Sequence, residues 1–192
     1  MKYYLKMGLV LLIITVIASG ILAYVNGLTK PIIQENQRKT KEEARKEVLP
    51  TAATFEEIGN FNGESIFAGK DADGNLVGYT FLASLYGYSS DVKSMVGVSN
   101  DLIVNKIKVI SQTETPGLGA NCVKPEFQAQ FSQKGLTGMK VNKDGGPIES
   151  ITGATITSRA VTNSIRNGLI RLEKIKAENE SETTSPNEEV TE

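Results

Sequence analysis

The sequence contains no histidine and only one cysteine, Cys122. Without histidine, the chain has no imidazole metal ligand, no histidine-ligated haem, no Ser-His-Asp triad and no histidine general base. A single cysteine can neither close an intramolecular disulfide nor hold an iron–sulfur cluster by itself, and we expect Cys122 to be an incidental or buried side chain. Any redox chemistry therefore requires a cofactor that is held by other residues.

The chain also lacks an excess of charge of either sign. Its 192 residues include 21 lysines and arginines against 22 aspartates and glutamates, which gives a net charge of -1. Proteins that bind phosphate backbones rely on a basic excess, so no nucleic-acid partner is predicted. The length suits one ordinary domain with appendages.

One long run has no charged side chain: residues 7–25, MGLVLLIITVIASGILAYV. As a helix, 19 residues reach roughly 28 Å, close to the thickness of the hydrocarbon core of a bilayer. Residues 1–25 are therefore predicted to form an N-terminal tail and a transmembrane helix. A signal peptide cleaved near Gly20 is the alternative, but the apolar residues that continue to Val25 favour an uncleaved anchor.

The charges that flank this run do not decide its orientation. Lys2 and Lys6 precede it, and several cations between Lys30 and Arg45 follow it. Counting them would place the C-terminal side in the cytoplasm, whereas long domains are translocated largely regardless of charge. Both orientations remain open at the level of residues.

Residues 26–49 are polar and predict a stalk helix, because good helix formers follow Pro31 and Pro50 provides a stop. Residues 50–176 are predicted to form the folded domain. The last segment, residues 177–192, is acidic and nearly devoid of large apolar side chains, so we expect it to be disordered.

Within the domain, residues 66–70 and 76–83 flank a turn-forming segment and read as a hairpin. A second strand pair is predicted at residues 92–98 and 102–110. Apolar side chains three and four residues apart then predict a helix from near Thr157 to near Ile175. Antiparallel hairpins with a C-terminal helix indicate an α+β fold.

The loop before this helix is rich in small and hydroxyl residues: residues 149–159 read ESITGATITSR. Gly153 and Ala154 would let a bulky group approach the backbone, and a helix N-terminus stabilises an anion such as a phosphate. The hydroxyl group of Ser158 could add a donor. The alternative is that Thr157 or Ser158 is only an N-cap and Gly153 only a turn residue.

This loop resembles the motif of covalently flavinylated FMN-binding domains, in which an acidic residue, two arbitrary residues and Ser or Thr precede Gly-Ala-Thr. Residues 152–155, TGAT, match it, and Glu149 stands where the family usually has aspartate. The resemblance implies that Thr155 is esterified to the phosphate of FMN by a flavin transferase that consumes FAD.

A second motif lies upstream at residues 114–119, ETPGLG. It resembles the loop beside the flavin in the G subunit of the Rnf electron-transport complex and in the related C subunit of the sodium-pumping quinone reductase. Pro116 would fix a turn, while Gly117 and Gly119 would let the backbone approach a flat ring; an ordinary β-turn is the alternative. A weaker resemblance covers residues 87–93. For Tyr79, Tyr86 and Tyr88 nearby, packing is favoured over stacking on a flavin.

The two motifs define the candidate cofactor-binding residues, and no catalytic residue or metal ligand is predicted beside them. They are Glu114, Thr115, Pro116, Gly117, Leu118, Gly119, Glu149, Thr152, Gly153, Ala154, Thr155, Thr157 and Ser158.

Taken over the whole chain, the resemblance is to the G subunit of the Rnf complex. It implies a flavoprotein subunit that relays electrons through covalent FMN in a ferredoxin:NAD oxidoreductase that translocates sodium ions or protons. The implied location is the cytoplasmic membrane of a prokaryote, with the N-terminus inside and the FMN domain outside. The implied partners are a cytoplasmic flavoprotein with the NAD site, iron–sulfur subunits and integral subunits.

Two other functions remain open. The chain could be an anchored extracytoplasmic FMN carrier that serves another reductase or extracellular electron transfer, because the same domain serves several assemblies. It could also be a stalked binding module without redox chemistry, in which the loop before the helix is only a cap.

Overall fold

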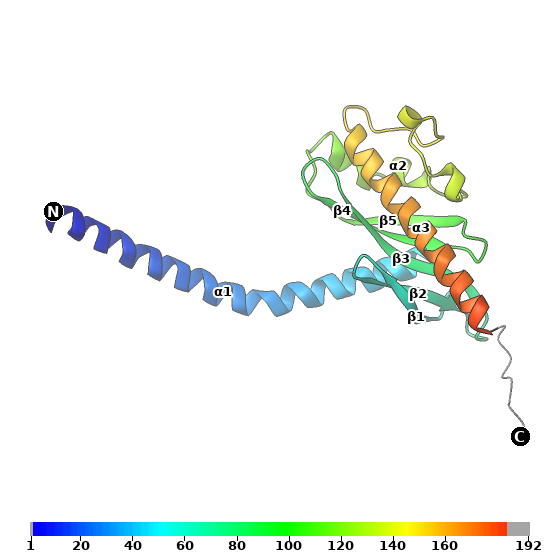
Figure 1. The fold of residues 1–192 in the computed structure, drawn as a ribbon, viewed down its shortest axis with the longest axis horizontal. Coiled ribbons are helices and arrows are strands. Elements are labelled where there is room, and N and C mark those ends of the chain that lie inside the picture. Colours follow the sequence, from blue (N-terminus) through cyan, green and yellow to red (C-terminus); the bar gives the residue numbers. More distant parts are fainter. Residues whose placement is uncertain (1, 184–192) are drawn as a thin grey trace, which may run out of the picture. The chain divides into compact units, whose positions relative to one another are not determined.

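The computed structural model describes residues 2–183. Its contacts divide the chain into two compact units, with the division between Thr40 and Lys41. The N-terminal unit consists of the greater part of helix α1 (Lys2–Val48), and the C-terminal unit holds the last turns of α1 and all other elements (Figure 1).

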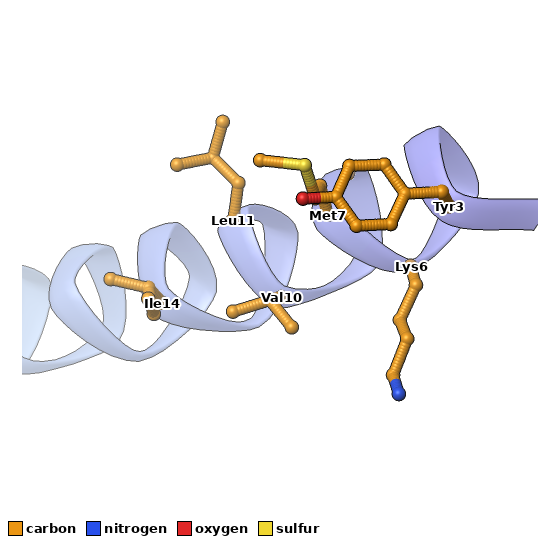
Figure 2. A pocket seen from close by; sticks show the side chains of 7 residues that line it. Tyr3, Lys6, Met7, Val10, Leu11 and Ile14 are labelled. Carbon is orange, nitrogen blue, oxygen red and sulfur yellow. The ribbon is translucent and has the colours of Figure 1, made fainter.

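The N-terminal part of α1 is exposed throughout its apolar run. Among residues 2–183, α1 alone is long and apolar enough to cross a membrane. Figure 2 shows its first turns, where Lys6 extends away from Met7 and Leu11. An exposed helix surface of this kind is stable in lipid or against other membrane helices.

Helix α1 is continuous across the predicted boundary between the membrane span and the stalk at residues 25 and 26. Pro31 lies inside the helix, where its ring removes one backbone donor without ending the helix. The folded unit begins at Lys41 rather than at residue 50, because Ala44 and Val48 are buried against the sheet.

Five antiparallel strands form one sheet in the order β1-β2-β3-β4-β5. The predicted α+β class and both hairpins are confirmed, and β1 is an addition: its sequence, TFEEIGNF, has no regular alternation that would predict a strand. The bounds are β1 Thr54–Phe61, β2 Glu64–Lys70, β3 Leu76–Tyr86, β4 Asp91–Val98 and β5 Val104–Ser111.

The two faces of the sheet are covered by different helices. Phe81 and Val96 belong to the large core that includes Val161, Ile165 and Leu169 of α3 (Thr155–Thr183). On the other face, Leu82 and Met95 pack with Ala44 and Val48 of α1. Helix α3 is thereby fixed along the sheet, which determines where its N-terminus lies (Figure 1).

Helix α3 is longer than predicted at both ends. It begins at Thr155 and continues to Thr183, so the structure describes residues 177–183 as part of the helix, where the sequence predicts the start of a disordered tail. The segment contains good helix formers such as alanine and glutamate, and a shortage of large apolar residues does not prevent a helix from extending into solvent. Residues 184–192, the rest of the predicted tail, lie outside the described residues.

Candidate functional site

The chain between β5 and α3 contains four short elements, which lie toward the N-terminal end of α3 (Figure 1). They are the 3-10 helices Gly119–Val123, Leu136–Gly138 and Asn142–Asp144 and the short helix α2 (Pro125–Ala129). Beside them lies a cavity of about 540 Å³. Its lining residues are Tyr88, Glu114, Thr115, Leu118, Gly119, Gly153, Ala154, Thr155, Ile156 and Thr157.

The cavity brings together the two sequence motifs, which lie more than thirty residues apart in the chain. Residues 114–119 contribute one wall and residues 153–157 contribute another. The turn between β3 and β4 contributes Tyr88. A single site built from both motifs is the arrangement that the resemblance predicts.

The N-terminus of α3 forms part of the cavity wall. Ser158 N–H donates the first helical hydrogen bond to the carbonyl of Ala154, 3.0 Å away. Thr155, Ile156 and Thr157 are therefore first-turn residues, whose N–H groups have no acceptor within a helix. Such a turn, together with the helix dipole, favours a bound anion.

The hydroxyl groups near this turn differ in their availability. Thr157 is buried and donates to Oε2 of Glu114, 2.6 Å away. Ser158 is buried, and its hydroxyl accepts a hydrogen bond from Ile151 N–H and donates one to the Ala154 carbonyl, each 2.9 Å long. Thr155 is half-buried, and its hydroxyl has no partner among the described residues.

The alternative in which Thr157 or Ser158 is the N-cap is therefore wrong. Both residues lie inside α3, so neither occupies the N-cap position that precedes Thr155. The same geometry removes Ser158 from the set of cavity-lining residues. The hydroxyl of Thr155 is the one at the start of α3 that is left free in the cavity.

Glu114 accepts five hydrogen bonds at the bottom of the site. Its Oε1 receives Ser89 N–H, Ser90 N–H and the Ser90 hydroxyl at 2.9, 3.0 and 3.3 Å. Its Oε2 receives Tyr88 N–H at 3.1 Å and the Thr157 hydroxyl. Burial disfavours the ionised form, but these hydrogen bonds outweigh it and hold the pKa of Glu114 below its usual range.

Acid should therefore weaken the domain through Glu114. Because the folded-state pKa is lowered, the carboxylate stabilises the fold at neutral pH, and this contribution is lost as the pH falls through that pKa, below the ordinary glutamate value of about 4.3. We expect the free energy of unfolding of the wild type, measured with urea in detergent, to fall more steeply from pH 7 to about pH 3 than that of Glu114→Gln. Parallel curves would contradict this assignment.

Four predicted site residues lie outside the cavity lining besides Ser158: Pro116, Gly117, Glu149 and Thr152. Glu149 and Thr152 line a neighbouring polar hollow instead. The side-chain amide of Gln130 holds the backbone of Glu149 there, accepting from its N–H at 2.7 Å and donating to its carbonyl at 3.4 Å. The Gly-Ala-Thr segment itself, residues 153–155, lines only the cavity and not this hollow.

The structure adds two residues to the cavity that the motifs do not supply. Tyr88 lines it while Tyr79 is buried in the core, and Ile156 lines it from the first turn of α3. Together with Leu118 they are large side chains that remain between 42% and 66% exposed. The weak resemblance of residues 87–93 was the signal for Tyr88, whereas nothing in the sequence distinguishes Ile156 from a core residue.

Cys122 is fully buried, and burial raises the pKa of its thiol to about 11. A protonated, buried thiol is unreactive at neutral pH. Within residues 2–183 there is no cluster of three or more acidic or cysteine side chains that could hold a metal ion.

Comparison with known families agrees with this geometry. Residues 87–170 match the FMN-binding domain family, and this range contains every residue that lines the cavity. Residues 2–48, which correspond to α1, match the RnfG N-terminal region. The fold and the site therefore define an FMN-binding domain that follows an apolar N-terminal helix.

Relatives match along most of the chain. It is 36% identical over 185 residues to the G subunit of the Na⁺-translocating ferredoxin:NAD⁺ oxidoreductase complex of Acetobacterium woodii, covering 85% of this chain and 89% of that protein. It is 31% identical over 176 residues to the G subunit of the ion-translocating oxidoreductase complex of Methanosarcina acetivorans, covering 88% and 94%. The chain belongs to the family of G subunits of ion-translocating oxidoreductase complexes, which confirms the resemblance seen in the sequence.

Two solved structures share the fold. The C subunit of the Na⁺-translocating NADH-quinone reductase from Parabacteroides distasonis aligns with a TM-score of 0.52 at 18% identity, over 80% of this chain and 96% of that one. NqrC of Shewanella oneidensis aligns with a TM-score of 0.50 at 20% identity, over 68% and 74%. With the apolar helix α1, membership of a membrane-complex family makes the chain a membrane protein with one span among its described residues.

Proposed function

We propose that this chain is the electron-relaying flavoprotein subunit of a membrane-bound ferredoxin:NAD oxidoreductase, with FMN joined to Thr155. One observation carries the covalent assignment: the Thr155 hydroxyl lies in the cavity, at the first turn of α3, without a hydrogen-bond partner among residues 2–183. Thr157 and Ser158 use their hydroxyls to hold the fold. Thr155 is therefore the acceptor that the structure supports best.

The residues present fit a flavin. The first turn of α3 would hold the phosphate, because its N–H groups and dipole stabilise an anion next to Thr155 Oγ1. The exposed side chains of Leu118, Ile156 and Tyr88 would border the ring system. Flavins transfer electrons singly or in pairs, and the protein contributes position and electrostatics.

Attachment requires a chemical step that other proteins catalyse. We propose that a flavin transferase brings FAD, and that Thr155 Oγ1 replaces AMP on the phosphorus of the FMN half. The new Thr–O–P ester forms as the pyrophosphate bond breaks, AMP leaves, and the hydroxyl proton passes to solvent. No oxidation or reduction accompanies this step. The ester would prevent loss of the cofactor.

The place of this protein in its complex follows from its family. The Acetobacterium woodii relative belongs to a Na⁺-translocating complex and the Clostridium ljungdahlii relative to a proton-translocating one. We propose that this chain works with partner subunits of such a complex, with α1 packed against integral subunits. We further propose that its FMN domain lies outside the cytoplasmic membrane and its N-terminus inside.

Two measurements test the proposal. The intact mass of protein isolated from its native host should exceed the sequence mass by FMN minus water, and the band should fluoresce after boiling in denaturant. Gentle solubilisation should recover the chain together with other subunits. An unmodified mass would remove the relay role, whereas a flavinylated chain that elutes alone would favour an electron carrier that serves another reductase.

We also propose that the transferase recognises Glu149, which the neighbouring hollow presents to solvent. Glu149→Ala should slow flavin attachment about tenfold or more while the fold stays intact, because loss of one charge-assisted contact is worth roughly 1.5–3 kcal/mol. The rate of fluorescence gain with coexpressed transferase measures this. Glu126→Ala, an exposed acid in the same hollow, is the matched control. Equal rates for both variants would show that Glu149 is dispensable.

A further inference from the structure

Glu114 lines the cavity, yet its carboxylate has no capacity left for a ligand. A carboxylate offers about four lone-pair positions, and the five protein donors that converge on Glu114 occupy them. Glu114 is 4% exposed, so water does not compete for these positions. The geometry therefore does not favour a direct contact between Glu114 and the flavin.

The donors come from two distant parts of the chain. Three consecutive backbone N–H groups, those of residues 88–90, belong to the turn between β3 and β4. The Ser90 hydroxyl belongs to the same turn, and the fifth donor, the hydroxyl of Thr157, belongs to the first turn of α3. The Ser90 hydroxyl donates to Glu114 and also accepts from Thr113 N–H at 2.8 Å. It thereby connects the β3–β4 turn to the segment between the end of β5 and Glu114.

We infer that Glu114 is a positioning residue, which joins the β3–β4 turn to the N-terminus of α3 and thereby fixes two walls of the cofactor cavity. The inference rests on the proposed function in so far as the cavity holds FMN. The connection itself is a property of the protein alone. It places Tyr88 on one side and Thr155 on the other at a fixed separation.

Two glycines support this inference independently. A Cβ atom at Gly87 would lie 2.9 Å from Oε1 of Glu114. A Cβ atom at Gly119 would lie 2.6 Å from the Thr157 hydroxyl and 2.8 Å from Oε2 of Glu114. All three distances are too short for a contact with a Cβ atom, so a side chain at either glycine would displace the carboxylate or the Thr157 hydroxyl.

The negative charge of Glu114 contributes to this connection as well as the size of its side chain. Glutamine has nearly the same size, but its amide replaces one acceptor by an NH₂ group, which would face Tyr88 N–H or Ser89 N–H. Donors that lose their acceptor in a buried site destabilise it. A buried charge in the cavity wall also acts over a longer range than one in water, so it opposes the addition of electrons to a nearby flavin.

Hydrogen exchange of the full chain in detergent, without flavin, tests the connection. In Glu114→Gln, the amides of residues 88–90 should exchange at least about tenfold faster than in the wild type, as expected for the loss of a buried acceptor. Glu126→Gln makes the same chemical change at an exposed position and should leave these rates unchanged. Unchanged rates in Glu114→Gln would overturn the inference.

In the flavinylated protein, the midpoint potential of the flavin tests the charge of Glu114, because a purely structural role of Glu114 would not change this potential. Glu114→Gln should raise the midpoint potential of the flavin, whereas Glu126→Gln, which removes an exposed charge outside the cavity lining, should leave it close to the wild-type value. An unchanged potential in Glu114→Gln would exclude a charge effect and overturn that part of the inference.

Two results remain informative if a variant fails. If Glu114→Gln does not fold, Thr157→Val must still speed exchange of the Ser158 amide, the first hydrogen-bonded amide of α3, without affecting residues 88–90, and exchange at the wild-type rate would overturn the inference. A wild-type chain that carries no flavin would refute the proposed function, while the exchange comparison would still decide the role of Glu114.

Discussion

Thr155→Val should abolish covalent flavin while leaving the fold intact. Valine keeps the β-branched shape of threonine and removes the hydroxyl that would form the ester, so neither helix geometry nor core packing changes greatly. Thr155 is half-buried and makes no side-chain hydrogen bond among residues 2–183, so the substitution leaves no donor or acceptor unsatisfied. Fluorescence of the denatured band, with coexpressed transferase, should fall to background, and circular dichroism should match the wild type.

The matched control is Thr115→Val, which removes another hydroxyl that lines the same cavity. It should retain the flavin, because Thr115 does not lie at a helix N-terminus where a phosphate would be held. A label that persists on Thr155→Val would assign the ester to another hydroxyl, with Thr152 and Thr157 as the next candidates. Peptide mass mapping would identify it.

Gly168→Ala should destabilise the folded unit by about 1–3 kcal/mol, the usual cost of overpacking a core. A Cβ atom at Gly168 would overlap the ring of Phe81, which is fully buried beneath α3. Alanine favours a helix over glycine by about 1 kcal/mol, so propensity alone predicts the opposite sign. Unfolding with urea in detergent, followed by circular dichroism, measures the outcome.

Asn167→Ala separates packing from propensity. Asn167 is exposed in the same helix, so the change should alter stability by less than about 0.5 kcal/mol. Phe81→Leu should partly rescue Gly168→Ala, because the smaller side chain makes room for the new methyl group. Strictly additive effects of the two substitutions would contradict a direct clash between them.

Short β-rich runs on either side of a turn-forming segment predicted the hairpin around residues 71–75, and the spacing of apolar residues predicted the core face of α3. The structure confirms both elements. Strand β1 was not predicted from the sequence. It is an edge strand with adjacent glutamates, so its formation depends on pairing with β2 rather than on a buried face. The extension of α3 beyond Ile175 was not predicted, because the prediction followed the apolar residues of the helix. The helix continues beyond them through residues with high helix propensity.

The two motifs predicted most of the cavity but not the role of each residue. Glu114 was expected beside the flavin, yet its carboxylate is engaged by protein donors. This arrangement could not be predicted, since it depends on a contact between residues 43 positions apart. Thr157 and Ser158 share the hydroxyl chemistry of Thr155, and only tertiary structure distinguishes a hydroxyl that supports the fold from one left free.

The location of the proposed acceptor, Thr155, at the start of α3 has a consequence for the order of biogenesis. Residues 153–157 are held in place because Val161, Ile165 and Leu169 dock on a sheet that is synthesised earlier. A nascent chain whose α3 has not yet emerged from the ribosome therefore lacks the cavity. A flavin transferase that recognises the folded cavity would not modify such a chain. Flavin loading would accordingly follow the docking of α3, and it would mark only those copies in which α3 has packed on the sheet.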